Sequence, residues 1–100
     1  MKIVVVGEQD FCEVFSFLGI EGIAVDDSQT LIEVLRERLS EKDTLFLISE
    51  FLYSSVSKQV EELKSESREA IVIEIPSPRS KGEEKFDLRK MLFSISGVKF

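Results

Sequence analysis

The chain has 100 residues, which suits one domain with a buried core but leaves no room for separate cofactor and catalytic lobes. Its 43% hydrophobic and 32% charged residues are typical of globular proteins, and its net charge of −6 argues against a general nucleic-acid binder. The single cysteine excludes an internal disulfide, and the lack of histidine removes the usual zinc ligand and the usual acid-base group of neutral pH.

The chain opens with a strand pattern followed by a helix pattern. Residues 2–6 form a β-branched run, which predicts a strand. Asp10 and Glu13 have the spacing of a capping box, and Gly19 suits the left-handed position after a helix end. The apolar residues that recur at helical spacing between these signals are Phe11, Val14, Phe15 and Leu18.

The same alternation continues to residue 75. Strands are predicted at 22–25, 44–48 and 70–75. Residues 26–28 form a capping cluster for a second helix, with residues 36–38 turned outward, and Ser49 can cap a third helix. The predicted buried positions are Leu31, Ile32, Leu35 and Leu39 in the second helix, and Leu52, Val56, Val60 and Leu63 in the third.

Strands that alternate with helices predict a doubly wound α/β fold, in which a four-stranded parallel sheet has helices on both faces. The first and third strands are continuous apolar runs, as expected for a central pair that is covered on both faces. With strand order 2-1-3-4, the first helix lies on one face and the second and third on the other. No apolar run approaches the ~20 residues of a membrane span, so we expect a cytosolic chain without direct membrane insertion.

The C-terminal part has a different character. Residues 1–75 are predicted as the α/β body, 76–85 as a flexible charged linker, and 86–100 as an amphipathic helix with a short tail. From residue 79 onward there are six basic and three acidic residues, whereas residues 1–78 contain seven and sixteen. The helix either folds back on the body or docks on a helix of another chain, and its pattern favours neither.

The carboxyl edge of the predicted sheet is acidic. Ligands of open parallel sheets bind at this edge, where the strand order reverses. A phosphate cradle needs several glycines and usually a basic side chain, whereas this edge offers one glycine and carboxylates. We therefore interpret the opening MKIVVVGEQDF as a strand and a helix start, in which acids favour the helix dipoles. The residues expected at this edge are Gly7, Glu8, Gln9, Asp10, Ser49 and Glu50.

A signalling domain of similar fold is the alternative function, with its chemistry at Glu8, Asp10 and Cys12. Phospho-receiver domains hold Mg²⁺ with such acids, but residues 48–50 read ISE where the phosphoacceptor aspartate should be. A phosphocarrier would use Cys12, yet Asp10 and Glu13 raise the pKa of its thiol, and a reactive cysteine needs a positive environment. We therefore expect a structural role for Cys12, with no bound metal and no catalytic residue.

The whole chain resembles the F subunit of the V-type and A-type (archaeal-type) rotary ATP synthases and ATPases. This family has a four-stranded parallel sheet domain and a movable C-terminal helix. The resemblance rests on KIVVVGEQDF at 2–11, FLGI at 17–20, FLISE at 46–50, VIEIPSP at 72–78 and SGVKF at 96–100.

The resemblance implies a non-catalytic rotor subunit of the central stalk, without a cofactor, located in the cytoplasm and peripheral to the cell membrane in the soluble sector. Its implied partners are the D subunit, which forms the coiled-coil shaft, and transiently the hexamer of A and B subunits through the C-terminal helix. In this role it couples rotation between the catalytic hexamer and the membrane ion-translocating ring, and modulates ATP hydrolysis. Carried over by position, the residues implied to contact the shaft are Phe86, Leu88, Arg89, Met91, Leu92 and Ile95.

Overall fold

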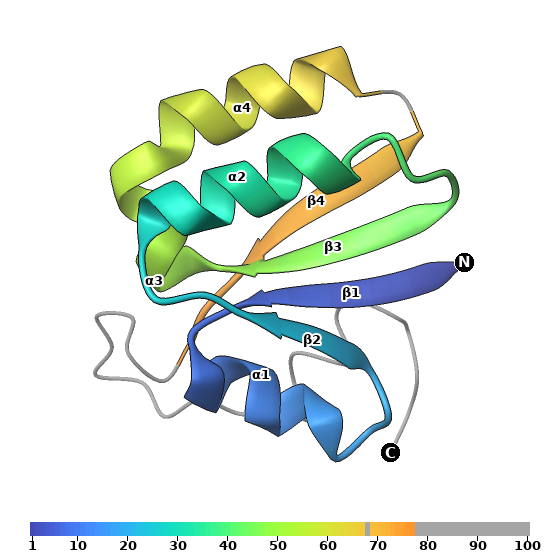
Figure 1. Cartoon of the computed structure of the whole chain (residues 1–100), viewed down its shortest axis with the longest axis vertical. Coiled ribbons are helices and arrows are strands. Elements are labelled where there is room, and N and C mark those ends of the chain that lie inside the picture. Colours follow the sequence, from blue (N-terminus) through green and yellow to red (C-terminus); the bar gives the residue numbers. More distant parts are fainter. Residues whose placement is uncertain (68, 78–100) are drawn as a thin grey trace.

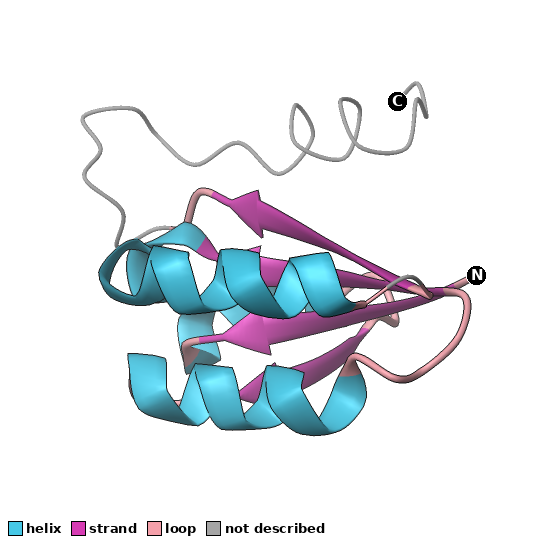
Figure 2. Cartoon of the chain, turned by 90° about the horizontal axis from the view of Figure 1, so that it is seen from above, coloured by secondary structure: helices cyan, strands magenta, loops and turns pink. Residues whose placement is uncertain are grey.

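A four-stranded parallel sheet forms the centre of the computed structural model, which describes residues 1–67 and 69–77. Its strand order is β2-β1-β3-β4, as predicted, and the strand arrows point to one edge in Figures 1 and 2. The predicted C-terminal helix lies outside the described residues, as does the predicted linker beyond Ser77. The strands are β1 (Lys2–Gly7), β2 (Glu21–Ala24), β3 (Thr44–Ser49) and β4 (Ala70–Ile75).

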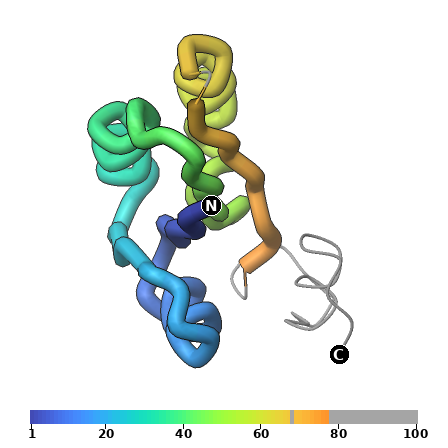
Figure 3. The backbone as a smooth tube through the Cα atoms, turned by 90° about the vertical axis from the view of Figure 1, so that its right-hand side faces the viewer, coloured from blue at the N-terminus to red at the C-terminus, as the bar shows by residue number. Residues whose placement is uncertain are grey.

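The described helices cover both faces of this sheet. Figure 3 looks along the strands and shows α1 on one side, with α2 and α4 on the other. This arrangement confirms the predicted doubly wound fold. The helices are α1 (Gln9–Ser16), α2 (Ser28–Arg38), α3 (Glu50–Tyr53), the 3-10 helix η1 (Ser54–Val56) and α4 (Ser57–Glu66).

Two hydrophobic clusters lie on opposite faces because successive residues of a strand point to opposite sides. All of β3 is buried, which explains its continuous apolar sequence. The cluster beneath α2 and α4 takes Val4, Val6, Phe46, Ile48 and Val72 from the strands. The cluster on the α1 side contains Val5, Leu45, Leu47 and Ile75, with Phe11, Cys12 and Phe15 from the helix.

The start of α1 differs from the predicted capping box. Glu8 is the N-cap residue, and no side-chain hydrogen bond caps the helix there. Asp10 instead lies in the first turn, and Glu13 accepts a hydrogen bond from Gln9. The prediction was wrong because only Glu8 separates the end of β1 from the helix, so the helix begins before Asp10.

At the end of α1, the predicted conformation of Gly19 is confirmed, whereas the predicted burial of Leu18 is wrong. Gly19 has the predicted left-handed conformation, with φ of +74°. Leu18 was predicted in the buried stripe but is 45% exposed, because α1 ends at Ser16 and the chain turns before Leu18 reaches the core.

The third predicted helix is interrupted. Leu52, Val56 and Val60 are buried as predicted, but they belong to α3, η1 and α4 respectively. Serine hydroxyls bind carbonyl groups around the interruption: Ser54 Oγ donates to Glu50 O, and Ser28 Oγ donates to Leu52 O from α2. Such bonds compete with regular helical hydrogen bonding.

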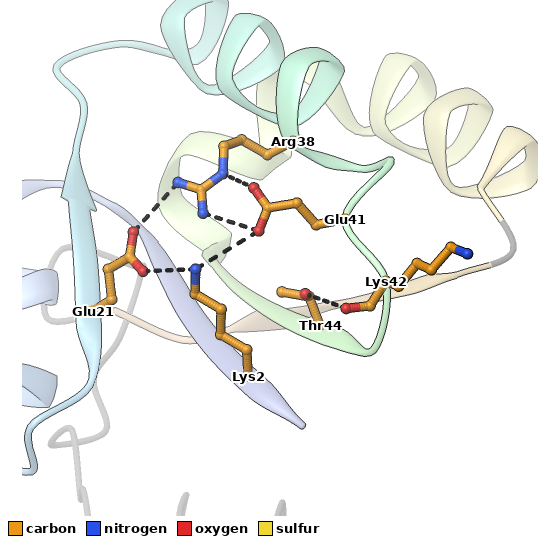
Figure 4. Close-up of polar contacts among 6 residues, drawn as sticks. All are labelled: Lys2, Glu21, Arg38, Glu41, Lys42 and Thr44. Atoms are coloured by element: carbon orange, nitrogen blue, oxygen red, sulfur yellow. Dashed lines mark hydrogen bonds and ion pairs between the residues drawn. The ribbon is translucent and has the colours of Figure 1, made fainter.

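An ion-pair network ties α2 to the amino edge of the sheet (Figure 4). Arg38 pairs with Glu41 through two nitrogens and with Glu21 on β2 at 3.3 Å, while Lys2 of β1 lies 3.3 Å from Glu21. The hydrogen bond with Glu41 raises the pKa of Arg38, and the same bond lowers the pKa of Glu41. Arg38 was predicted to turn outward, but these partners on neighbouring elements hold it half-buried.

Candidate functional site at the carboxyl edge of the sheet

The carboxyl edge of the sheet brings several of the predicted site residues together. Gly7 ends β1, Ser49 ends the neighbouring β3, and Glu8 stands between β1 and α1. All three are buried, whereas Gln9 and Glu50 are exposed and Asp10 is half-buried. The buried part of the edge is therefore smaller and less acidic than the sequence suggested.

Gly7 is required by close packing at this edge. A Cβ atom at this position would lie 2.6 Å from Cδ2 of Phe11 and 2.8 Å from Cβ of Ser49. Because Cβ atoms essentially never approach heavy atoms so closely, any larger residue would force α1 or β3 to move. The glycine thus permits helix-to-strand packing, a role different from the phosphate approach that such a glycine has in nucleotide loops.

Glu8 is a buried acid, with 5% of the residue exposed, and it connects distant parts of the chain. Its Oε2 accepts a hydrogen bond of 2.9 Å from Oγ of Ser77, just beyond the end of β4. Since β3 lies between β1 and β4, this bond spans the carboxyl end of β3. We call the Glu8–Ser77 hydrogen bond the edge strap.

Two buried oxygen atoms near the edge strap have no hydrogen-bond partner among the described residues. They are Oε1 of Glu8 and Oγ of Ser49. Ser49 was predicted to cap the third helix, but its side chain makes no capping bond, although Ser49 does occupy the N-cap position of α3. Leaving a buried polar group without a hydrogen bond lowers the stability of a fold by about 1–3 kcal/mol. Both oxygens could therefore still accept a hydrogen bond.

The electrostatics of the edge oppose phosphate binding. Helix N-termini attract anions, and Glu8 already supplies a carboxylate at the N-terminus of α1. A second unit negative charge ~4 Å away would be repelled by roughly 4 kcal/mol at an effective dielectric constant of ~20. A carboxylate at this helix start therefore disfavours a bound anion at the edge where nucleotide-binding domains of this fold hold their ligand.

Cys12 has the environment of a packed thiol. Its Sγ lies 3.5 Å from the carbonyl oxygens of Gly7 and Ile23, and the residue is buried in the α1-side cluster. Burial is the largest cause that raises its pKa, and the charges of Glu8 and Asp10 raise it further. A thiol with a raised pKa is a poor nucleophile at neutral pH, which agrees with the predicted structural role.

Sequence reasoning missed one member of this site. Ser77 falls within the predicted linker, yet it is buried and bound to Glu8. A hydroxyl two residues beyond a predicted strand was the only signal in the sequence, and serines in such positions are common in loops. The predicted shaft-contacting residues, from Phe86 to Ile95, lie outside the described residues.

Two kinds of feature are absent from the part of the chain that the structure describes. No cluster of three or more His, Cys, Asp or Glu side chains among residues 1–67 and 69–77 could hold a metal ion. Within the same part of the chain, no helix is both long and apolar enough to span a membrane.

Fold and site together define a small doubly wound α/β domain with a buried carboxylate, that of Glu8, at the carboxyl edge of its sheet. The family model of the ATP synthase (F/14-kDa) subunit matches residues 3–92, so the chain belongs to this family of V/A-type ATP synthase subunits. This confirms the resemblance found in the sequence and connects the chain with ATP synthesis and ion transport. None of the curated proteins compared with the chain matches it.

Proposed function

We propose that the chain is a non-catalytic subunit of the central stalk, where it couples rotation between the catalytic hexamer and the membrane ion-translocating ring. The family match over residues 3–92 carries this proposal. The carboxyl edge supports it, because Glu8 stands where a nucleotide-binding domain of this fold would present anion donors. In this role the chain is cytoplasmic and peripheral to the membrane, as part of the soluble sector.

The proposed partner is the D subunit, which forms the coiled-coil shaft. Residues 86–95 present apolar side chains at i, i+3, i+4 and i+7, the spacing with which a helix docks on another helix. The excess of basic residues from residue 79 onward would complement acidic side chains on the partner helix. The proposed contacts are Phe86, Leu88, Arg89, Met91, Leu92 and Ile95.

The same segment is proposed to modulate ATP hydrolysis through transient contact with the A and B subunits. A helix that is tethered by a charged linker can exchange between two docking positions when their free energies are similar. Removing residues 79–100 is expected to change the ATP hydrolysis rate of the assembled complex while leaving the rest of the complex intact.

Co-purification with the coiled-coil shaft tests the proposed function most directly. The full chain should elute together with a tagged shaft protein on size exclusion, and residues 79–100 should gain protection from hydrogen exchange on binding. The variant Leu88→Asp/Leu92→Asp should weaken the complex, because charges replace two apolar contacts. Ser94→Asp is the matched control, since it adds a charge at a polar position of the same segment.

Two results would contradict this proposal. One is the absence of a complex with the shaft under conditions in which both chains are folded. The other is equal weakening by the double variant and by Ser94→Asp, which would mean that the apolar positions are not the contact. Transfer of phosphate to Glu8, Asp10 or Cys12 from a phosphodonor would instead favour the signalling alternative.

A further inference from the structure

β4 is an edge strand of the sheet, and no described strand pairs with its outer side. The order β2-β1-β3-β4 places it at one end of the sheet, where Figure 3 shows it in orange. Within residues 1–67 and 69–77, β3 is the strand that pairs with it. In an edge strand, every second residue directs its backbone N–H and C=O outward, where these groups can bond another strand.

The other edge strand, β2, has features that discourage strand pairing, and β4 lacks them. β2 has four residues, one of them a glycine, and its charged Glu21 pairs with Lys2 and Arg38. A short length, a glycine and a charge each make an edge less able to accept a further strand. β4 has six residues, AIVIEI, without glycine, proline or lysine. Its one charged residue, Glu74, lies 3.2 Å from Lys64 of α4, and this ion pair offsets its charge.

An exposed isoleucine adds apolar surface to the β4 edge. Ile71 is 52% exposed, and the other exposed large apolar residues that the structure describes lie outside the strands. Ile71 and Ile73 point to the α1 side, because they pair with Leu45 and Leu47, which belong to the cluster on that side. Natural proteins usually avoid an exposed apolar side chain on an open edge strand. We therefore expect another strand to cover this edge.

We propose that β4 pairs with β4 of a second copy of this chain, antiparallel about a two-fold axis, so that two four-stranded sheets join into one. With Val72 at the axis, Ile71 of each copy lies opposite Ile73 of the second copy, on the α1 side. Side chains that are directly opposite in an antiparallel pair have Cβ atoms about 4.5–5.5 Å apart, so these isoleucines bury each other.

The charges of β4 agree with this register. Glu74 of each copy lies opposite Ala70 of the second copy, so no acid faces an acid. An axis at Glu74 would instead place two carboxylates directly opposite each other, which destabilises a strand pair. A two-fold contact requires a surface that complements itself, and β4 meets this requirement with Val72 at the axis.

The small size of the contact sets the affinity that we expect. One pair of short strands buries less than the ~1,200 Å² of standard-size interfaces, and such small interfaces are typical of weak association. The dimer should therefore form at micromolar to millimolar concentrations. This inference concerns the free chain and goes beyond the stalk role without resting on it, so either can fail while the other holds.

Sedimentation equilibrium of the full chain tests the dimer between about 1 µM and about 1 mM, a range that covers weak dissociation constants. The wild type should shift from monomer to dimer as the concentration rises. Ile71→Lys should weaken association roughly tenfold or more, because each dimer loses two buried isoleucines and gains two charges. Phe51→Lys is the matched control, since it adds the same charge at a 45% exposed apolar residue of α3, and it should leave association unchanged.

Disulfide cross-linking tests the register. A mixture of Ile71→Cys and Ile73→Cys chains should oxidise mainly to the mixed dimer, because opposite residues have the Cα separation that a disulfide requires. The wild type is the control and should not cross-link, since its one thiol, that of Cys12, is buried. Circular dichroism verifies that each variant is folded. Ile71→Thr, which keeps a β-branched side chain, should still weaken association and decides the question if Ile71→Lys unfolds.

A chain that stays monomeric across this concentration range would overturn the proposal. Amides of residues 70–75 protected from hydrogen exchange in that monomer would mean that another segment of the same chain covers the edge. Protection gained only on adding the shaft would assign the edge to that partner instead.

Three results in a chain that does dimerise would also overturn it. Equal weakening by Ile71→Lys and Phe51→Lys would mean that added charge alone opposes association. A dimer that Ile71→Lys leaves intact would use a different surface. Dimers without the mixed cross-link would exclude the antiparallel register about Val72.

Discussion

At the scale of single residues, Gly7 gives the sharpest expectation. Gly7→Ala should lower the free energy of unfolding by about 1–3 kcal/mol, because the new methyl group has no space between α1 and β3. Phe11 cannot move aside easily, since it is fully buried and its ring lies 5.2 Å from that of Phe15. Urea denaturation followed by circular dichroism measures this difference.

Gly22→Ala is the matched control for that variant. Its added Cβ would approach Cβ of Cys12 to 3.1 Å, and it lies on the edge strand β2, where small shifts are easier. We therefore expect a smaller loss of stability for Gly22→Ala than for Gly7→Ala. A larger loss of stability for Gly22→Ala than for Gly7→Ala would mean that the structure relieves the close approach at Gly7 without cost.

Asp27 gives a pH-dependent expectation at the same scale. Its carboxylate caps α2 by accepting from the backbone N–H and the hydroxyl of Thr30, both at 2.8 Å, and these bonds lower its pKa. A carboxyl group whose pKa is lower in the folded chain contributes stability above its unfolded pKa and loses it as the pH falls through the folded value.

The melting temperature of Asp27→Ala should accordingly lie below that of the wild type at pH 7. The gap should narrow as the pH falls below about 4, near the ordinary pKa of an aspartate. Asp26→Ala is the control, because this neighbouring acid lies outside the cap position. A gap that stays constant down to about pH 2, well below that ordinary value, would show that ionisation of Asp27 does not contribute.

At the scale of elements, a contact from another helix lies at the interruption between α3 and α4. Ser28 at the start of α2 donates to Leu52 O at 2.8 Å and lies 2.7 Å from Oγ of Ser55. Ser28→Ala should destabilise the chain by about 0.5–1.5 kcal/mol and speed hydrogen exchange around η1. Ser65→Ala, whose hydroxyl bonds Glu62 O within one helix, should do neither.

The strands could be predicted because a local run of apolar residues marks each of them. The sheet order could be predicted because continuous apolar runs also indicate which two strands form the central pair. A buried parallel strand needs a continuous apolar run, and β1 and β3 both have one. The cap of α2 could also be predicted, since Asp27 and Thr30 are three residues apart.

The predictions that failed depend on neighbours far away in the sequence. The third helix is interrupted where Ser28 of α2 donates to the carbonyl oxygen of Leu52, and Arg38 pairs with Glu21 of β2. At the carboxyl edge, the acidic residues could be identified from the sequence, but their arrangement could not. Glu8 is buried, and Ser77 satisfies one of its oxygens from 69 positions away, a pairing that no local pattern encodes.

At the scale of the whole molecule, every described strand and both hydrophobic clusters lie within residues 1–77. A chain cut after Ser77 should therefore unfold in a single cooperative transition, with thermal and urea curves that coincide for different probes. A chain cut after Ile75 loses the edge strap and leaves Glu8 buried without its hydroxyl partner, so it should melt at a lower temperature. If the longer fragment instead lacks a cooperative transition, residues 78–100 belong to the folded body, and the predicted division into body, linker and helix is wrong.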